Sequence, residues 1–219
     1  MKSRSKTHKL SHYLRATVFI YLMSQLAFSW ADTSSQPEQG LLILGDSLSA
    51  GFGLLEGEEW PALLQQRLLH KKSSVRIINA SISGETSLGG ASRITALLDR
   101  HPVTWLIIEL GANDGLRGQS LSQMRDNLSF IIEQAQSRNI KVLLLGMHIP
   151  PNYGKRYTQA FHQSFVKVSQ AFDVPLIPFF LDGVAGEAAL NQADGIHPTA
   201  EAQPIILNTV WPAIKTLLD

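Results

Sequence analysis

The sequence predicts an α/β fold in which a five-stranded parallel sheet is covered by helices on both faces. Apolar runs of strand length alternate with longer segments of helical periodicity, and no internal repeat or linker divides them. Because parallel strands are joined by right-handed crossovers, this alternation places helices on either side of the sheet. The predicted strands are Leu41–Leu44, Val75–Ala80, Trp105–Leu110, Val142–Met147 and Pro175–Phe180.

Five helices are predicted between and after these strands. The first is amphipathic, because Trp60, Leu64 and Leu68 recur at helical spacing. The last contains Pro204 and Pro212, so we expect a kink or a break there. The predicted helices are Glu58–His70, Ser87–Arg100, Ser120–Arg138, Tyr157–Phe172 and Thr199–Leu218.

Residues 1–31 are predicted to be a cleaved signal peptide. A basic leader precedes the mostly apolar stretch Ala16–Phe28, and Ser29-Trp30-Ala31 offers small residues where a signal peptidase reads. An uncleaved membrane anchor is the competing interpretation, but the apolar stretch is shorter than the ~20 residues that a spanning helix needs. We therefore expect a flexible arm over residues 32–40, a single domain over 41–219, and export to a bacterial periplasm or the medium.

Composition excludes several classes of function. Five of the 19 basic residues and none of the 18 acidic residues lie in the leader, so the remainder carries a net charge of −4. A mildly acidic chain without a basic patch gives no reason to expect a nucleic-acid partner. The sequence has no cysteine, which excludes disulfides, a cysteine nucleophile and a Cys-ligated metal.

Ser47 is the candidate nucleophile. It follows the strand Leu41–Leu44 in the run Gly45-Asp46-Ser47, and ligands bind at the carboxyl ends of strands in open α/β sheets. A turn with a helix N-cap would explain these three residues equally well. The nucleophile interpretation therefore depends on finding its partners elsewhere in the chain.

The chain supplies those partners after other predicted strands. Asp194 and His197 are close enough in one loop for the carboxylate to orient the imidazole as a general base. Gly84 and Asn113 follow the second and third strands, and they offer a backbone N–H and a side-chain amide to an oxyanion. Each motif alone also fits an ordinary turn, but a parallel sheet gathers all of them at one edge.

The motifs together resemble the SGNH (GDSL-type) serine hydrolases. They are GDSLSAG at 45–51, NASISGETS at 79–87, ELGANDGLRG at 109–118, PPNYGKRY at 150–157, FDVPLIPFF at 172–180 and DGIHPTAEAQP at 194–204. The resemblance implies a three-layer α/β/α flavodoxin-like sandwich with catalytic Ser47, Asp194 and His197. It also implies an oxyanion hole formed by the Ser47 and Gly84 N–H groups and the Asn113 side chain. The branch of this family that the sequence resembles has thioesterase, protease, lysophospholipase and arylesterase activities.

Other residues have less specific interpretations. His148 ends the fourth strand, but no acid lies nearby in sequence to orient it, so we interpret it as a wall residue. Glu109 is expected to be a buried structural acid. Asp46 is expected to stabilise the nucleophile loop by accepting hydrogen bonds from backbone N–H groups. Asp114 is a candidate cap for the helix that follows it. Four residues are candidate walls of an acyl site: Leu116, Ile149, Pro151 and Tyr153.

The sequence thus predicts a serine acyl hydrolase that cleaves carboxylic esters and thioesters through an acyl-enzyme, without a cofactor. No HxH or HExxH cluster supports a metal site. A carbohydrate O-deacetylase and a non-catalytic periplasmic lipid-binding protein are the alternatives. We expect a small-molecule or lipid acyl substrate, at most transient contact with membrane lipid, and a monomer.

Overall fold

The computed structural model describes residues 39–219, and its centre is a five-stranded sheet. The strands follow the order β2-β1-β3-β4-β5, and every pair of neighbours is parallel. The predicted five-stranded parallel sheet is therefore confirmed. Its strands are β1 (Gln39–Gly45), β2 (Val75–Asn79), β3 (Val103–Glu109), β4 (Lys141–Leu145) and β5 (Leu176–Ile177).

Strand β1 is hydrogen-bonded to β2 on one side and to β3 on the other. The side chains of its residues Leu41 to Leu44 are fully buried, although successive side chains point to opposite faces. Both faces must therefore be covered, which is why the strand is a continuous apolar run. Ser47 lies just beyond the carboxyl end of this inner strand.

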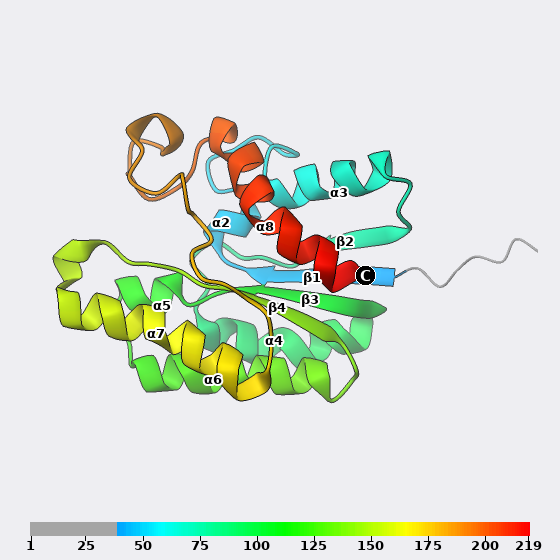
Figure 1. Ribbon diagram of the computed structural model, residues 1–219, viewed down its shortest axis with the longest axis horizontal. Helices are drawn as coiled ribbons and strands as arrows, with labels where there is room; N and C mark the ends of the chain where they lie inside the picture. Colours follow the sequence, from blue (N-terminus) through cyan, green and yellow to red (C-terminus); the bar gives the residue numbers. More distant parts are fainter. Residues whose placement is uncertain (1–38) are drawn as a thin grey trace, which may run out of the picture. The chain divides into compact units, whose positions relative to one another are not determined.

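Two layers of helices cover the sheet (Figure 1). On one face lie α3 (Trp60–His70) and α8 (Gln203–Leu218), which pack against each other. On the other face α4 (Ser87–Arg100) packs against α6 (Leu121–Gln136), and α6 packs against α7 (Lys155–Phe172). The predicted three-layer α/β/α sandwich is confirmed.

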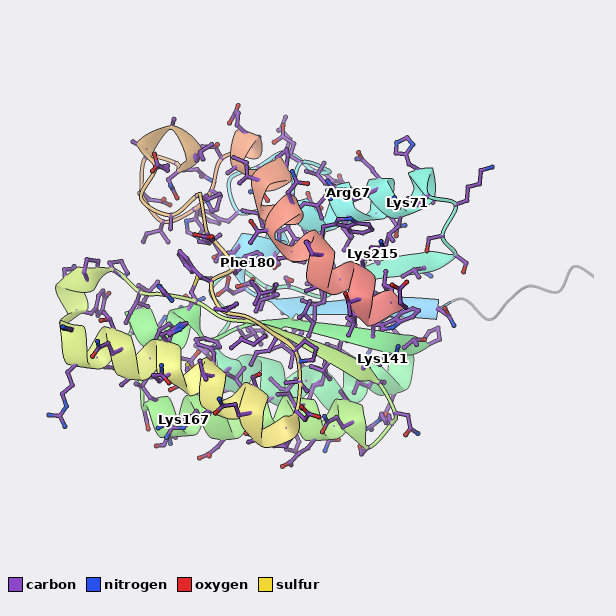
Figure 2. All side chains as sticks on the ribbon, in the orientation of Figure 1. Arg67, Lys71, Lys141, Lys167, Phe180 and Lys215 are labelled. Carbon is purple, nitrogen blue, oxygen red and sulfur yellow. The ribbon has the colours of Figure 1, made fainter. Side chains whose placement is uncertain are left out.

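Aromatic side chains stabilise the helix layer formed by α3 and α8. Arg67 of α3 and Lys71, its C-cap residue, lie over the Trp211 ring of α8, 5.2 and 5.8 Å from its centroid (Figure 2). Beneath them, Trp60 and Phe180 are fully buried and meet edge to face with ring centroids 5.8 Å apart. Phe180 thereby anchors the start of the loop that leads to His197.

Three expectations about element boundaries are wrong. The arm was expected to reach residue 40, but Gln39 and Gly40 already pair with β2, and the Gly40 N–H donates to Pro102 O. Strand β5 has two residues instead of six, because Pro178 has no N–H to continue the ladder. The expected break in the last helix occurs next to Pro204, where η3 (Ala200–Ala202) ends and α8 begins, but the break expected at Pro212 is wrong, because α8 continues through it.

Short helices occupy the connections at the carboxyl ends of the strands. They are α2 (Ser47–Ala50), α5 (Ala112–Leu116), η1 (Pro151–Tyr153) and η2 (Ala188–Leu190). Within residues 39–219 no helix has the length and apolar character needed to cross a membrane. The expected signal peptide at 1–31 and the remainder of the arm, 32–38, lie outside the described residues.

Candidate active site

Ser47 is the first residue of α2, directly after β1. Asp46 is the N-cap of this helix, and its Oδ1 accepts the Leu48 N–H at 3.0 Å. Gly51 ends the helix after one turn in a left-handed conformation, with φ of 75°, which favours glycine. The capped turn holds Ser47 partly exposed at the sheet edge.

His197 and Asp194 complete a hydrogen-bonded series with Ser47. His197 Nε2 lies 2.9 Å from Ser47 Oγ, and His197 Nδ1 lies 2.7 Å from Asp194 Oδ2. If Nδ1 carries the ring proton and donates it to Asp194, Nε2 is free to accept the Ser47 hydroxyl proton. The 150 residues between Ser47 and His197 are thus bridged by one contact that suits proton transfer.

Backbone donors fix the Asp194 carboxylate. Its Oδ1 accepts the N–H groups of Ile196 and His197 at 2.9 and 3.0 Å, and Gly195 provides the positive φ of 69° between them. These backbone bonds, with the His197 N–H first, and the imidazole bond lower the Asp194 pKa to about 2. Asp194 is therefore ionised at neutral pH and can orient an imidazole and stabilise its protonated form.

A second loop supports the histidine. The Phe52 ring lies against the His197 ring, with centroids 4.4 Å apart. Gln192 Nε2 donates to Phe52 O at 2.8 Å and to Pro198 O at 3.1 Å, and the Gln192 N–H donates to His197 O at 2.7 Å. Gln192 thus joins the loop after α2 to the loop that carries His197, a role that no sequence motif indicated.

The predicted oxyanion donors lie close together. Arg117 Nη2 donates to Gly84 O at 3.0 Å and also lies 3.4 Å from Asn113 Oδ1, so it bridges the two residues. Gly84 has a φ of 78°, which an L side chain rarely adopts. Asn113 Nδ2 donates to both Asp46 Oδ2 and Glu85 O at 3.0 Å. An oxyanion would have to compete for one of these amide hydrogens.

Two buried carboxyl groups support the nucleophile turn. Glu109 Oε2 accepts from Ser49 Oγ at 2.7 Å and from the Asp46 N–H at 3.3 Å, which confirms the expectation of a buried, hydrogen-bonded acid. Burial, and then the charge of Asp46, raise the pKa of Glu109 well above its usual range. Burial also raises the pKa of Asp46 to about 6, against the hydrogen bonds from Leu48 and Asn113.

Asp114 does not cap the helix that follows it. Its carboxylate accepts the Ser87 N–H at 2.8 Å and the Ser87 hydroxyl at 2.5 Å, so it binds the first turn of α4 instead. Ser120 is the N-cap of α6 and accepts the Gln123 N–H. The buried Asp114 therefore joins α5 to α4 beside Asn113.

A cavity of about 820 Å³ opens beside Ser47 and His197. Three of the four predicted wall residues line it: Leu116, Ile149 and Pro151. Tyr153 does not, because its hydroxyl points to Leu116 O, to which it donates at 3.0 Å, and its ring lines a separate shallow hollow. Tyr153 can support the wall only through Leu116.

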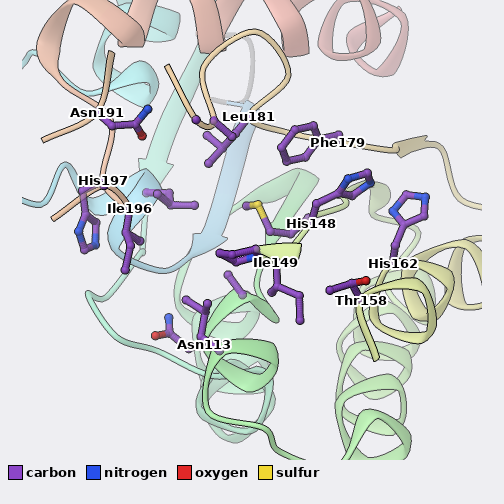
Figure 3. A pocket seen from close by; sticks show the side chains of 18 of the residues that line it. Asn113, His148, Ile149, Thr158, His162, Phe179, Leu181, Asn191, Ile196 and His197 are labelled. Carbon is purple, nitrogen blue, oxygen red and sulfur yellow. The ribbon is translucent and has the colours of Figure 1, made fainter. Parts of the chain in front are cut away.

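His148 also lines this cavity, but on the side away from His197 (Figure 3). Its ring stacks on Phe179, with centroids 4.4 Å apart, and within residues 39–219 it makes no hydrogen bond to a carboxylate. His162 of α7, which the sequence analysis did not single out, faces the cavity beside it. Its position four residues after Thr158, another lining residue, is the periodic signal that could have revealed it.

The part of the chain that the structure describes offers no group of side chains arranged to bind a metal ion. Among residues 39–219 no three His, Asp or Glu side chains are grouped so that they could hold an ion. A serine, a histidine and an aspartate in hydrogen-bonded series, at the edge of a doubly covered parallel sheet, instead define the class of serine hydrolases.

Comparison with known proteins identifies the family. The chain belongs to the GDSL-like lipase/acylhydrolase family, whose model matches residues 43–204. This confirms the family that the motifs resemble. The chain is similar to the esterase TesA of Pseudomonas aeruginosa, with 47% identity over 186 residues, 85% of this chain and 92% of the relative.

Two further proteins are similar over most of their length. The thioesterase 1/protease 1/lysophospholipase L1 of Escherichia coli is 43% identical over 82% of this chain and 85% of its own. The crystal structure of the psychrotrophic esterase EstA from Pseudoalteromonas, inhibited by monoethylphosphonate, matches with a TM-score of 0.79 at 44% identity. That match covers 82% of this chain and 98% of the EstA chain.

Proposed function

We propose that this protein is a serine esterase and thioesterase that cleaves acyl substrates at Ser47. One observation carries the proposal: Ser47 Oγ lies 2.9 Å from His197 Nε2, at the mouth of a largely apolar cavity. The names of the relatives, an esterase and a thioesterase/protease/lysophospholipase, agree with this chemistry. Inhibition of EstA by a phosphonate also agrees, since reactive phosphonates phosphonylate activated serines.

The first half of the reaction forms an acyl-enzyme. His197 Nε2 takes the Ser47 proton while Oγ attacks the carbonyl carbon, and the resulting oxyanion accepts from the Ser47 and Gly84 N–H groups and from Asn113 Nδ2. The tetrahedral intermediate collapses when the bond to the leaving oxygen or sulfur breaks. His197 donates its proton to that leaving group, and Asp194 stabilises the imidazolium in between.

The second half releases the acid. His197 Nε2 removes a proton from water, whose oxygen attacks the acyl carbon through the same oxyanion site. The Ser47 oxygen then leaves with the proton from His197, which restores the starting state. A carboxylic acid and an alcohol or thiol are the products.

The substrate class follows from the cavity. Its lining includes Leu48, Leu116, Met147, Ile149 and Leu181, so medium to long acyl chains fit better than acetate. We infer lysophospholipids or simple esters as substrates, hydrolysed by a monomer that touches membrane lipid only transiently. The basic and apolar leader of the sequence supports a periplasmic location.

Labelling and hydrolysis together test the proposal. The purified protein should react stoichiometrically with a fluorophosphonate and hydrolyse p-nitrophenyl esters, and Ser47→Ala should abolish both. Activity retained by Ser47→Ala would contradict the assignment. Absence of labelling in the folded wild-type protein would favour the non-catalytic lipid-binding alternative. A chain-length series that peaks at two carbons would favour the O-deacetylase.

A further inference from the structure

Two histidines lie at the end of the cavity remote from Ser47. Figure 3 shows His148 and His162 with Thr158 on one side of the cavity, and His197 and Asn113 on the other. The His148 and His162 rings meet edge to face with centroids 4.3 Å apart. Phe179 stacks on the other side of His148, so the His148 ring is held between two aromatic groups.

The polar atoms of this pair have no partner in the described structure. His162 Nδ1 is buried and accepts or donates no hydrogen bond within residues 39–219. His148 is exposed and makes only ring contacts and electrostatic contacts within this range. The other nitrogens of the pair, which no side chain or backbone group occupies, can therefore offer hydrogen bonds to a polar group that reaches this end of the cavity.

The path to this pair is apolar. Ile149 lies between the two ends of the cavity, and Leu116, Met147 and Leu181 line it as well. A hydrocarbon chain attached at Ser47 therefore meets apolar walls first and the two imidazoles last. A chain that ended in a methyl group would form no hydrogen bond with these imidazoles.

The charge state of His148 favours a neutral ligand. Burial, and then the neighbouring His162, lower the pKa of His148, while the Asp182 carboxylate acts in the opposite direction. At neutral pH this imidazole offers one N–H donor and one lone pair but no positive charge. A hydroxyl group, which both donates and accepts, matches that pair of functions.

We propose that the His148–His162 end of the cavity binds an uncharged hydroxyl group on the acyl chain of the substrate, so that the protein prefers hydroxyacyl esters and thioesters. The inference rests on the proposed function, since the acyl group held at Ser47 must extend along this cavity. His148 and His162 then select the substrate and take no part in proton transfer at Ser47.

The test compares p-nitrophenyl esters whose chains of six to twelve carbons end in either a hydroxyl or a methyl group. The measured quantity is the ratio of kcat/KM for the two endings at each length. One added hydrogen bond makes this ratio about five- to tenfold higher at the length that reaches the pair. The gain should fall on KM, because the bond exists in both the bound substrate and the transition state.

Three variants locate the effect. His162→Phe and His148→Phe keep an aromatic ring but remove the nitrogens, so each should lower the ratio about five- to tenfold. The ratio is taken within each variant, so that any change in hydrolysis of the methyl-terminated chain cancels. His162→Gln keeps a donor and an acceptor and should retain part of the preference. His70→Phe, at an exposed site at the end of α3, is the matched control and should not change the ratio.

The outcomes separate this inference from the proposed function. If the protein hydrolyses both kinds of ester and kcat/KM is the same for the two endings at every length, the inference is overturned and the proposed function stands. A preference for carboxyl-terminated chains would contradict the proposal that the bound group is uncharged. If the folded wild-type protein hydrolyses no ester and reacts with no fluorophosphonate, the proposed function fails. Thermal melting checks each variant, and His148→Phe serves as the test if His162→Phe is unfolded.

Discussion

Asn113 Nδ2 donates to Asp46 Oδ2 over 3.0 Å, and this bond ties α5 to the residue that precedes Ser47. The second amide hydrogen is used by Glu85 O at the same distance. Both donors of the side chain are therefore satisfied before a substrate binds. The amide is held in place beside the nucleophile turn, and an oxyanion can accept one of its N–H groups in place of the oxygen that accepts it now.

Asn113→Ala should lower kcat by about two to three orders of magnitude, the usual effect of removing one preorganised oxyanion donor. KM should change less, because the donor acts mainly in the transition state. Steady-state hydrolysis of a p-nitrophenyl ester measures both constants. Gln119→Ala, which removes an exposed amide from the loop after α5, is the control. An unchanged kcat in Asn113→Ala would place the oxyanion elsewhere.

Asp194→Asn should lower kcat by about two to four orders of magnitude, because an amide nitrogen facing His197 Nδ1 favours the tautomer whose Nε2 cannot accept a proton. The variant can retain one oxygen for the Ile196 and His197 N–H groups, so the loop should remain folded. The kcat of the wild type and the variant, with circular dichroism of each, checks this expectation. A variant with more than half of the wild-type kcat would exclude Asp194 as the orienting acid.

The buried carboxyl groups predict a stability that falls as pH rises. The Asp46 pKa is about 6 in the folded protein and about 4 when unfolded, so the folded state binds more protons between these values. The unfolding free energy should be highest near pH 4, because protonation of Asp194 lowers it at more acidic pH, and it should decline up to pH 6, by on the order of 3 kcal/mol for Asp46. Glu109, also raised, extends the decline to higher pH.

Urea denaturation at pH 4 to 7 measures this decline. Glu109→Gln cannot ionise and keeps an oxygen for the Ser49 hydroxyl, so its stability should depend less on pH than that of the wild type. A wild-type stability that rises from pH 4 to 6 would mean that the buried carboxyl groups do not dominate.

The strands and the site motifs were predictable because their signals are local. A buried parallel strand must be an apolar run, and Gly-Asp-Ser or Asp-Gly-Ile-His turns sit where such runs end. The arrangement of Gln192 and Arg117 was not predictable. Each depends on contacts across the tertiary structure, such as Gln192 with Phe52, 140 residues away.

Two expectations that involved proline residues were wrong, in opposite ways. Pro212 was expected to disturb the last helix, yet α8 continues through it, because burial of Val210, Ile214 and Leu217 outweighs one lost hydrogen bond. Pro178 was placed inside a six-residue strand, but there the missing N–H ends the pairing. Propensity alone cannot distinguish these cases, because packing against neighbouring elements decides them.

Gly146→Ala should destabilise the protein by about 1–3 kcal/mol, as expected for overpacking. A Cβ at this position would lie 2.6 Å from Pro178 O, and a backbone atom cannot move aside as a side chain can. The same segment holds the Phe180 N–H, which donates to Gly146 O at 2.9 Å. Urea denaturation measures the change. An unaltered midpoint would show that the close approach of Gly146 to Pro178 tolerates a methyl group.

Ile149→Phe should shift the preferred acyl chain towards shorter lengths, because Ile149 is buried against the core and lines the cavity, and a larger ring there occupies space that a chain would fill. The measurement is kcat/KM for p-nitrophenyl esters of two to sixteen carbons. Tyr153→Phe is the matched control: it removes only the hydroxyl that donates to Leu116 O, outside the cavity lining. Its length profile should match that of the wild type. A profile shifted by Tyr153→Phe but not by Ile149→Phe would place the acyl chain on the other side of Leu116.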